Sequence, residues 1–149
     1  MIYKASNDEF ILVVEDIVEI AKLVARAIME VYMEAKAGDG DDALKHAVAL
    51  ADLILVSSLQ KKYPNVPIIS EKNKMTEFQT RSDYRCFFCV DPLNGTKDFI
   101  ARNGQFTINI GLCELNNPVV GVVACPALDI PLVYYSATGC GAFVKRIDG

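Results

Sequence analysis

The sequence lacks the features that several classes of protein require. Its longest apolar runs, residues 10–14 and 119–128, are too short or are interrupted by Pro126, so we expect no membrane-spanning segment. Lys and Arg form no basic block and the net charge is −4, which argues against duplex nucleic acid as a partner. Residues 1–9, MIYKASNDE, lack the charged-then-apolar layout of a signal peptide, and we therefore expect a cytoplasmic protein.

Side chains for histidine or cysteine chemistry are few. His46 is the single histidine, and the five cysteines are scattered among apolar segments at positions 86, 89, 113, 125 and 140. The spacing of Cys86 and Cys89 would suit a redox or zinc site. In a strand, however, these two positions point to opposite faces, and no second pair or nearby histidine completes a zinc site. We expect buried, reduced thiols.

The period of apolar residues changes once along the chain. Helical spacing predicts a long helix over residues 7–35, with Ser6 and Glu9 as a capping box, and a second helix over residues 42–62. Later segments read as strands, with a hairpin turn at 114–118: 66–70, 85–91, 105–113, 119–125, 131–135 and 141–145. The sequence therefore predicts one α+β domain over residues 1–149. In it, two long N-terminal helices are layered on a mostly antiparallel sheet of about six strands.

The most informative stretch is residues 90–100, V-D-P-L-N-G-T-K-D-F-I. It places oxygen-bearing side chains at the end of an apolar strand and a Gly-Thr pair at the start of a helix. Divalent cations prefer oxygen ligands, and phosphate is bound by backbone N–H groups at helix N-termini. The stretch therefore predicts a metal ion and a phosphate group held together.

This stretch resembles the D-P-[IL]-D-G-[ST] signature of the inositol monophosphatase superfamily, which consists of magnesium-dependent phosphomonoesterases. The continuation through residue 112 most resembles the 3′(2′),5′-bisphosphate nucleotidase branch, and residues 63–71, 118–127 and 134–143 are also similar to family segments. The resemblance implies the first half of a sugar-phosphatase fold, with the C-terminal α/β domain absent from this sequence. It also implies a small phosphorylated substrate, either a 3′-phosphonucleotide or an inositol phosphate. Association with a C-terminal half or with a second copy is left open.

The resemblance also assigns roles to residues. It implies Mg²⁺ ligands at Glu71, Asp91, the carbonyl of Leu93 and Asn94, phosphate binding by Gly95 and Thr96, and catalytic roles for Thr96, Glu71 and Asp91. Other interpretations stay open from the residues themselves. Glu71 can be a solvated glutamate at a strand end, and Asp91 can be a helix cap or an Asx turn before a proline.

Several positions depart from the family pattern. Asn94 stands where the family has an aspartate, and Lys72 stands where it often has a second acidic residue. A gapless count places the family's Pro-Val-Thr-x-x-Asp segment on residues 43–48, so its water-activating Thr and Asp are Lys45 and Val48 here. All four changes remove negative charge, add positive charge or remove a water-activating group, and we therefore expect a weakened Mg²⁺ site.

Two functional hypotheses follow. The chain is either a magnesium-dependent phosphomonoesterase, with little turnover on its own, or a degenerate homologue that acts as a binding or regulatory module. Asp52, one helical turn beyond Val48, and His46 are the remaining candidates for activating water, and both are poorly placed by the count.

Overall fold

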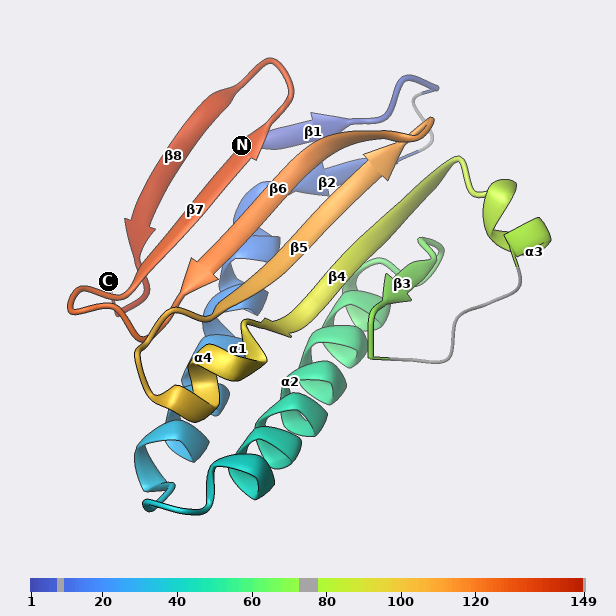
Figure 1. Cartoon of the computed structure of the whole chain (residues 1–149). Helices are drawn as coiled ribbons and strands as arrows, with labels where there is room; N and C mark the ends of the chain where they lie inside the picture. The colour runs from blue at the N-terminus through green and yellow to red at the C-terminus, as the bar shows by residue number, and fades with distance from the viewer. Residues whose placement is uncertain (8–9, 73–77, 149) are drawn as a thin grey trace.

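The computed structural model describes residues 1–7, 10–72 and 78–148 (Figure 1). Its helices are α1 (Val14–Glu34), α2 (Gly40–Lys62), α3 (Phe78–Ser82) and α4 (Thr96–Ala101). Its strands are β1 (Ile2–Lys4), β2 (Ile11–Val13), β3 (Ile68–Ser70), β4 (Cys86–Asn94), β5 (Thr107–Glu114), β6 (Asn117–Cys125), β7 (Leu132–Ala137) and β8 (Gly141–Arg146). Among the described residues, no helix is long and apolar enough to cross a membrane.

The main sheet has six strands in the order β3-β4-β5-β6-β7-β8. The β3–β4 pair is parallel, and every other neighbouring pair is antiparallel. A separate two-stranded ladder joins β1 and β2 near the N-terminus. The predicted α+β class with a mostly antiparallel sheet is confirmed.

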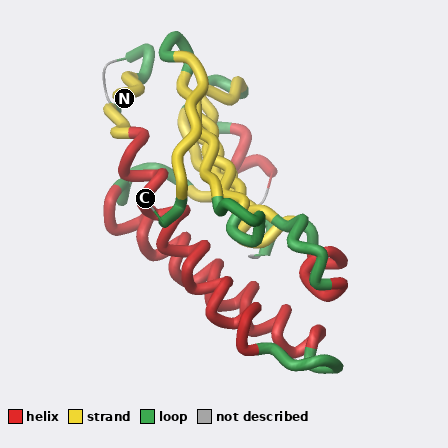
Figure 2. Tube along the Cα trace, turned by 90° about the vertical axis from the view of Figure 1, so that its left-hand side faces the viewer, coloured by secondary structure: helices red, strands yellow, loops and turns green. Residues whose placement is uncertain are grey.

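The two long helices cover one face of this sheet (Figure 2). Helix α1 contacts β5, β6 and β7, while α2 contacts β4 and the short α4. The buried residues of α1 and α2 recur at intervals of three or four, so each helix turns one apolar side toward the strands. Alternate residues of β5, Ile108, Ile110 and Leu112, are buried against them. The layered arrangement predicted from the sequence is therefore confirmed.

The predicted helix over residues 7–35 was wrong at its start, because α1 begins at Val14 and a short hairpin precedes it. Ser6 does not cap a helix. Its backbone N–H and its hydroxyl both donate to the carboxylate of Glu114, at 2.8 and 2.6 Å. Glu9, the other half of the expected capping box, lies outside the described residues. A contact with a distant strand thus replaces the local cap.

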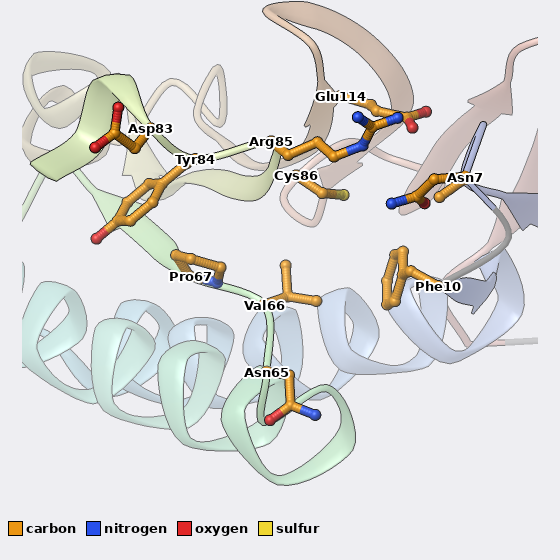
Figure 3. A pocket seen from close by; sticks show the side chains of 11 residues that line it. Asn7, Phe10, Asn65, Val66, Pro67, Asp83, Tyr84, Arg85, Cys86 and Glu114 are labelled. Atoms are coloured by element: carbon orange, nitrogen blue, oxygen red, sulfur yellow. The ribbon is translucent and has the colours of Figure 1, made fainter.

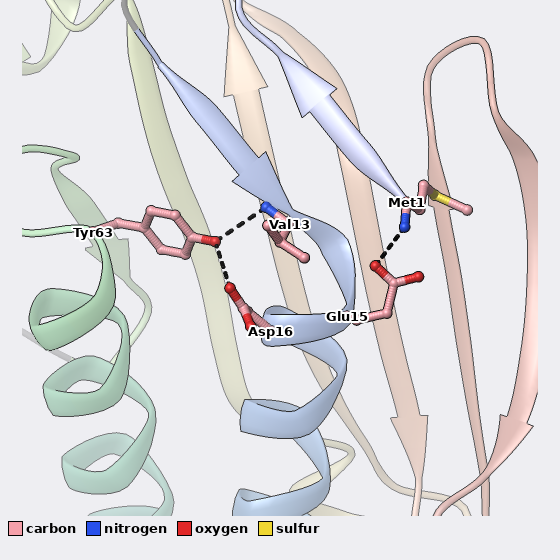
Figure 4. Close-up of polar contacts among 5 residues, drawn as sticks. All are labelled: Met1, Val13, Glu15, Asp16 and Tyr63. Atoms are coloured by element: carbon pink, nitrogen blue, oxygen red, sulfur yellow. Dashed lines mark hydrogen bonds and ion pairs between the residues drawn. The ribbon is translucent and has the colours of Figure 1, made fainter.

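Polar contacts tie this N-terminal region to the end of α2 (Figure 4). The hydroxyl of Tyr63 accepts a hydrogen bond from the N–H of Val13 at 3.2 Å and donates one to Asp16 at 3.3 Å. The amino group of Met1 forms an ion pair with Glu15 at 2.6 Å. The first turn of α1 is therefore held by both β1 and the C-terminus of α2.

The predicted hairpin turn at 114–118 is confirmed. Leu115 and Asn116 connect β5 to β6, and both adopt positive φ angles, 49° and 63°. Two-residue hairpin loops favour such left-handed conformations because their twist matches that of the strands.

The cysteine prediction was right in part. All five cysteines are free, and Cys86 and Cys89 differ in exposure, as expected for opposite faces of β4. Cys89 and Cys140, however, are exposed, so the expected burial was wrong for these two, and the other three are only half-buried.

Candidate metal and phosphate site

The candidate site lies where β3 ends beside its parallel neighbour β4, which continues for four more residues. The register pairs Ser70 with Val90, and the N–H of Glu71 donates to the carbonyl oxygen of Val90 at 3.3 Å. Parallel strands present their carboxyl ends at the same edge of a sheet. Glu71 and Asp91, each one residue further on, therefore become neighbours although they are distant in the sequence.

Burial and a hydrogen bond to Glu71 alter the protonation of Asp91. Burial, followed by the hydrogen bond to Glu71 and the charge of Glu71, raises the pKa of Asp91 to about 6. Lys72 and a hydrogen bond from the backbone of Leu93 act in the opposite direction. Two carboxylates that are hydrogen-bonded to each other resist simultaneous ionisation, so Asp91 keeps its proton into mildly acidic solution.

One oxygen of this pair has no hydrogen bond. Among the described residues, Oδ1 of Asp91 is buried without a partner. A buried acceptor left unpaired is unfavourable, and a cation or a hydrogen-bond donor at this point would relieve it. The Leu93 contact also gives Asp91 the character of an Asx turn before Pro92, which was the other interpretation of this residue.

A hollow of about 360 Å³ opens beside the pair. Its lining includes Glu71 and Asp91 together with two polar residues that the sequence analysis did not single out, Ser70 and Asn109. Asn109 is paired with Asp91 across β4 and β5, and its side-chain oxygen Oδ1 accepts a hydrogen bond from the hydroxyl of Thr107 at 3.2 Å. Strand register, once known, would have placed Asn109 here.

The remaining predicted site residues lie beyond this hollow. Pairing of β4 with β5 shifts between Asp91 and Asn94, and the bend that follows leads into α4. Leu93 is fully buried, whereas Asn94 is exposed. The structure thus brings together the two acidic residues, while Leu93, Asn94, Gly95 and Thr96 form the adjoining bend.

Gly95 has a conformation that other residues rarely adopt. Its φ is +94°, and an added Cβ would lie 2.9 Å from the carbonyl oxygen of Gln105. Only glycine fits here without movement of the backbone, which fixes how the chain passes from β4 into α4.

The upstream substitutions lie on α2. Val48 packs against the core, while Lys45 and His46 are exposed. Asp52, one turn further on, accepts a hydrogen bond from the hydroxyl of Ser70 at 2.8 Å. Asp52, a weak candidate for activating water by the gapless count, is thus connected to the residue before Glu71.

The donor set fits one weakly held cation better than a metal cluster. Within the described part of the chain, no three His, Cys, Asp or Glu side chains are grouped closely enough to hold a metal ion. The pair formed by Glu71 and Asp91 still offers oxygen ligands and an unpaired buried oxygen.

A separate hollow of about 380 Å³ lies near the other end of β4 (Figure 3). It is lined by residues of the N-terminal segment, the α2–β3 connection and the start of β4, among them Phe10, Val66 and Arg85. None of the predicted site residues lines it.

Comparison with known proteins defines the family. Residues 7–148 match the model of the inositol monophosphatase family, and the chain belongs to that family.

Relatives point to one branch of the family. The 3′(2′),5′-bisphosphate nucleotidase CysQ of Salmonella typhimurium is 36% identical over 130 residues, which cover 84% of this chain and 52% of the relative. A crystal structure of CysQ from Bacteroides thetaiotaomicron has a TM-score of 0.79 and 31% identity, covering 89% of this chain and 48% of that one. A crystal structure of the suhB protein of Bartonella henselae has a TM-score of 0.73 and 26% identity, and the match covers 87% of this chain and 50% of that one. The chain thus spans about half the length of the relatives it matches.

Proposed function

We propose that this chain forms the metal-binding part of a cytoplasmic, magnesium-dependent phosphomonoesterase of the 3′(2′),5′-bisphosphate nucleotidase type. The observation that supports this most is the hydrogen-bonded pair of Glu71 and Asp91, where β3 ends beside β4. The similarity to CysQ nucleotidases supports a small 3′-phosphorylated nucleotide as the substrate, and membership of the inositol monophosphatase family supports an inositol phosphate as the alternative.

In this proposal the chain's own residues bind Mg²⁺ and orient the phosphate group. Glu71, Asp91, the carbonyl of Leu93 and the amide oxygen of Asn94 hold Mg²⁺, and the N–H groups of Gly95 and Thr96 hold the phosphate. Bound Mg²⁺ would supply positive charge that neutralises the phosphoryl oxygens. Both acidic side chains must be ionised to bind it, and for Asp91 that condition is met above about pH 6.

We further propose that efficient turnover needs a C-terminal α/β domain, corresponding to the half of the relatives that this chain does not match. Val48 and Lys45 cannot activate water in the way that an aspartate and a threonine can. A positioned general base typically contributes a factor of about a hundred to ten thousand in rate. The neutral Asn94 weakens metal binding further.

A second candidate function is a binding or regulatory module without turnover. The observation that favours it is the position of Val48, which packs against the core where the count expects a water-activating aspartate. Under this alternative the site binds a phosphorylated ligand and releases it unchanged.

The deciding experiment measures phosphate release from adenosine 3′,5′-bisphosphate and from inositol 1-phosphate, with and without Mg²⁺, and with lithium as an inhibitor. We expect no appreciable release by residues 1–149 alone. The triple variant Lys45→Thr, Val48→Asp, Asn94→Asp should release phosphate only when the second half of the Salmonella relative is added as a separate chain. Adding Asp91→Asn to the triple variant should abolish that gain.

Two results would overturn the proposal. Lithium-sensitive turnover by the unaltered chain would show that another carboxylate activates water and that the count over residues 42–48 is wrong. Tight binding of the nucleotide without hydrolysis by the restored, two-chain protein would favour the regulatory module.

A further inference from the structure

A short chain of hydrogen bonds runs from α2 to the segment that carries Glu71. The hydroxyl of Ser70 donates to Asp52 at 2.8 Å, and the same oxygen accepts the backbone N–H of Lys72 at 3.4 Å. Ser70 is only 4% exposed, so its hydroxyl has little access to water as a substitute partner. These two bonds bracket Glu71 on both sides in the sequence.

The direction of these bonds depends on Asp52. A hydroxyl has one hydrogen and accepts through its lone pairs. With its hydrogen held by the carboxylate of Asp52, Ser70 presents a lone pair toward the N–H of Lys72. Glu71 is fastened independently to β4 through its own N–H, which donates to Val90 at 3.3 Å. The turn after β3 is therefore held from one side by α2 and from the other by β4.

We propose that Asp52 is a positioning residue, which acts through Ser70 to hold Glu71 against Asp91 and so to form the metal site. The inference rests on the proposed function for the identity of that site. It also gives Asp52 a role other than activating water, because its carboxylate is already bonded to Ser70 at the end of β3. Asp52 thereby strengthens a site that has lost a negative charge at Asn94.

The first test needs no metal. Amide hydrogen exchange of Glu71 and Lys72 is measured by NMR in the unaltered chain and in Asp52→Ala, relative to amides in the middle of β5. We expect both amides to exchange about fivefold faster in the variant, the effect of losing one hydrogen bond. Ser70→Ala should give the same increase, and the double variant should add nothing, because both changes break one chain of bonds.

Matched variants separate positioning from general loss of stability. Asp42→Ala removes an exposed aspartate of the same helix, and Ser57→Ala removes a hydroxyl that bonds only within α2. Neither should change the relative exchange of Glu71 and Lys72. Asp52→Asn keeps an acceptor oxygen for Ser70 and should restore the slow exchange. Equal acceleration of the β5 amides, or failure of Asp52→Asn to restore protection, would overturn the inference.

The second test measures Mn²⁺ affinity by electron paramagnetic resonance. We expect the dissociation constant to rise about tenfold in Asp52→Ala and in Ser70→Ala, and to stay within about twofold in Asp52→Asn. Unchanged affinity in Asp52→Ala would refute the positioning role. Absence of Mn²⁺ binding by the unaltered chain would instead refute the proposed function, and the exchange experiment would still decide the role of Asp52 in holding the turn.

Discussion

The hydroxyl of Tyr3 donates a hydrogen bond to the carboxylate of Glu114, which joins the first strand of the chain to the end of β5. Ser6 donates two more hydrogen bonds to the same carboxylate. Glu114 is 6% exposed, so this carboxylate exchanges nearly all of its water for these three donors. Through these three hydrogen bonds, Glu114 attaches the N-terminal segment to the end of β5.

Replacement of Glu114 should destabilise the protein and alter its response to acid. Hydrogen bonds from Ser6 and then Tyr3 lower the pKa of Glu114, so its stabilising effect is present above the ordinary glutamate value and is lost as the pH falls through the folded value. We expect Glu114→Ala to lower the free energy of unfolding by about 3 kcal/mol at pH 7, and by less at pH 3. Urea unfolding at both pH values measures this. Glu34→Gln, an exposed change on α1, is the control, and an equal loss at both pH values would contradict the prediction.

Asp91 at the candidate site should change the stability with pH in the opposite direction to Glu114. Because burial and Glu71 raise the pKa of Asp91 to about 6, the folded state holds a proton that the unfolded state releases near pH 4. The protonated carboxyl of Asp91 therefore contributes fully to the free energy of unfolding below pH 4, and this contribution is lost as the pH rises through 6. After allowance for solvent screening, we expect Asp91→Asn to be more stable than the unaltered chain by about 1 kcal/mol at pH 7, with no gain at pH 4. Thermal unfolding in metal-free buffer measures the difference. Asp129→Asn, an exposed change, should show no such trend, and a gain that is equal at both pH values would refute the assignment.

Metal affinity should follow the charge at Asn94. Titration calorimetry with Mg²⁺ should show at most one weak site in the unaltered chain and a site at least about tenfold tighter in Asn94→Asp, because a carboxylate replaces a neutral amide. Asn65→Asp adds the same charge at an exposed position before β3 and should leave the affinity unchanged. Tight binding of two or three ions by the unaltered chain would contradict this expectation.

Gly95 should tolerate substitution worse than a glycine of similar conformation elsewhere. Gly95→Ala introduces both a strained φ and a clash with the Gln105 carbonyl, whereas Gly139, with φ +79°, has no atom within 4 Å of an added Cβ. We expect a loss of about 3 kcal/mol for Gly95→Ala and about 1 kcal/mol for Gly139→Ala in chemical unfolding. Equal losses would mean that the backbone of the bend moves to accommodate the methyl group.

The thiols should fall into two classes. Cys89 and Cys140 are exposed, whereas burial raises the pKa of the other three, to about 11 for Cys86. Since the thiolate is the reactive form, labelling of native protein should show two fast groups and three slow ones. The double variant Cys89→Ser, Cys140→Ser should lose the fast phase, and its persistence would show that another thiol is accessible.

Local pattern was sufficient for most of the architecture. Apolar residues at helical spacing predicted α2 to within two residues at its start, and alternation located the strands from β4 to β8. The N-terminal hairpin was missed because Phe10, Val13, Val14 and Ile17 fit helical spacing equally well. The hairpin rather than a helix forms there with hydrogen bonds from Ser6 to Glu114, a residue 108 positions away. A contact of that range leaves no trace in a local pattern.

The candidate site, like the fold, could be predicted only in part. Resemblance to family motifs identified Glu71 and Asp91, but residue spacing alone could not have paired them, since parallel strands carry no short-range signal of their register. Asn109 and Ser70 were missed for this reason. The gapless count directed attention to Val48, and only the hydrogen bond from Ser70 shows that Asp52 is the acidic residue of α2 that reaches the candidate site.

The parallel pairing of β3 with β4 also bears on the order of folding. The β5–β6 hairpin closes through two residues, Leu115 and Asn116, so its ladder forms with little loss of chain entropy. Strand β3 must instead reach β4 across the intervening segment and α3, and contacts that close longer loops form more slowly. We therefore expect pulse-labelling during refolding to protect β5 and β6 amides before that of Glu71. Glu71 and Asp91 would then come together last, after most of the sheet has formed. The repulsion between their charges would therefore not slow the formation of the antiparallel strands.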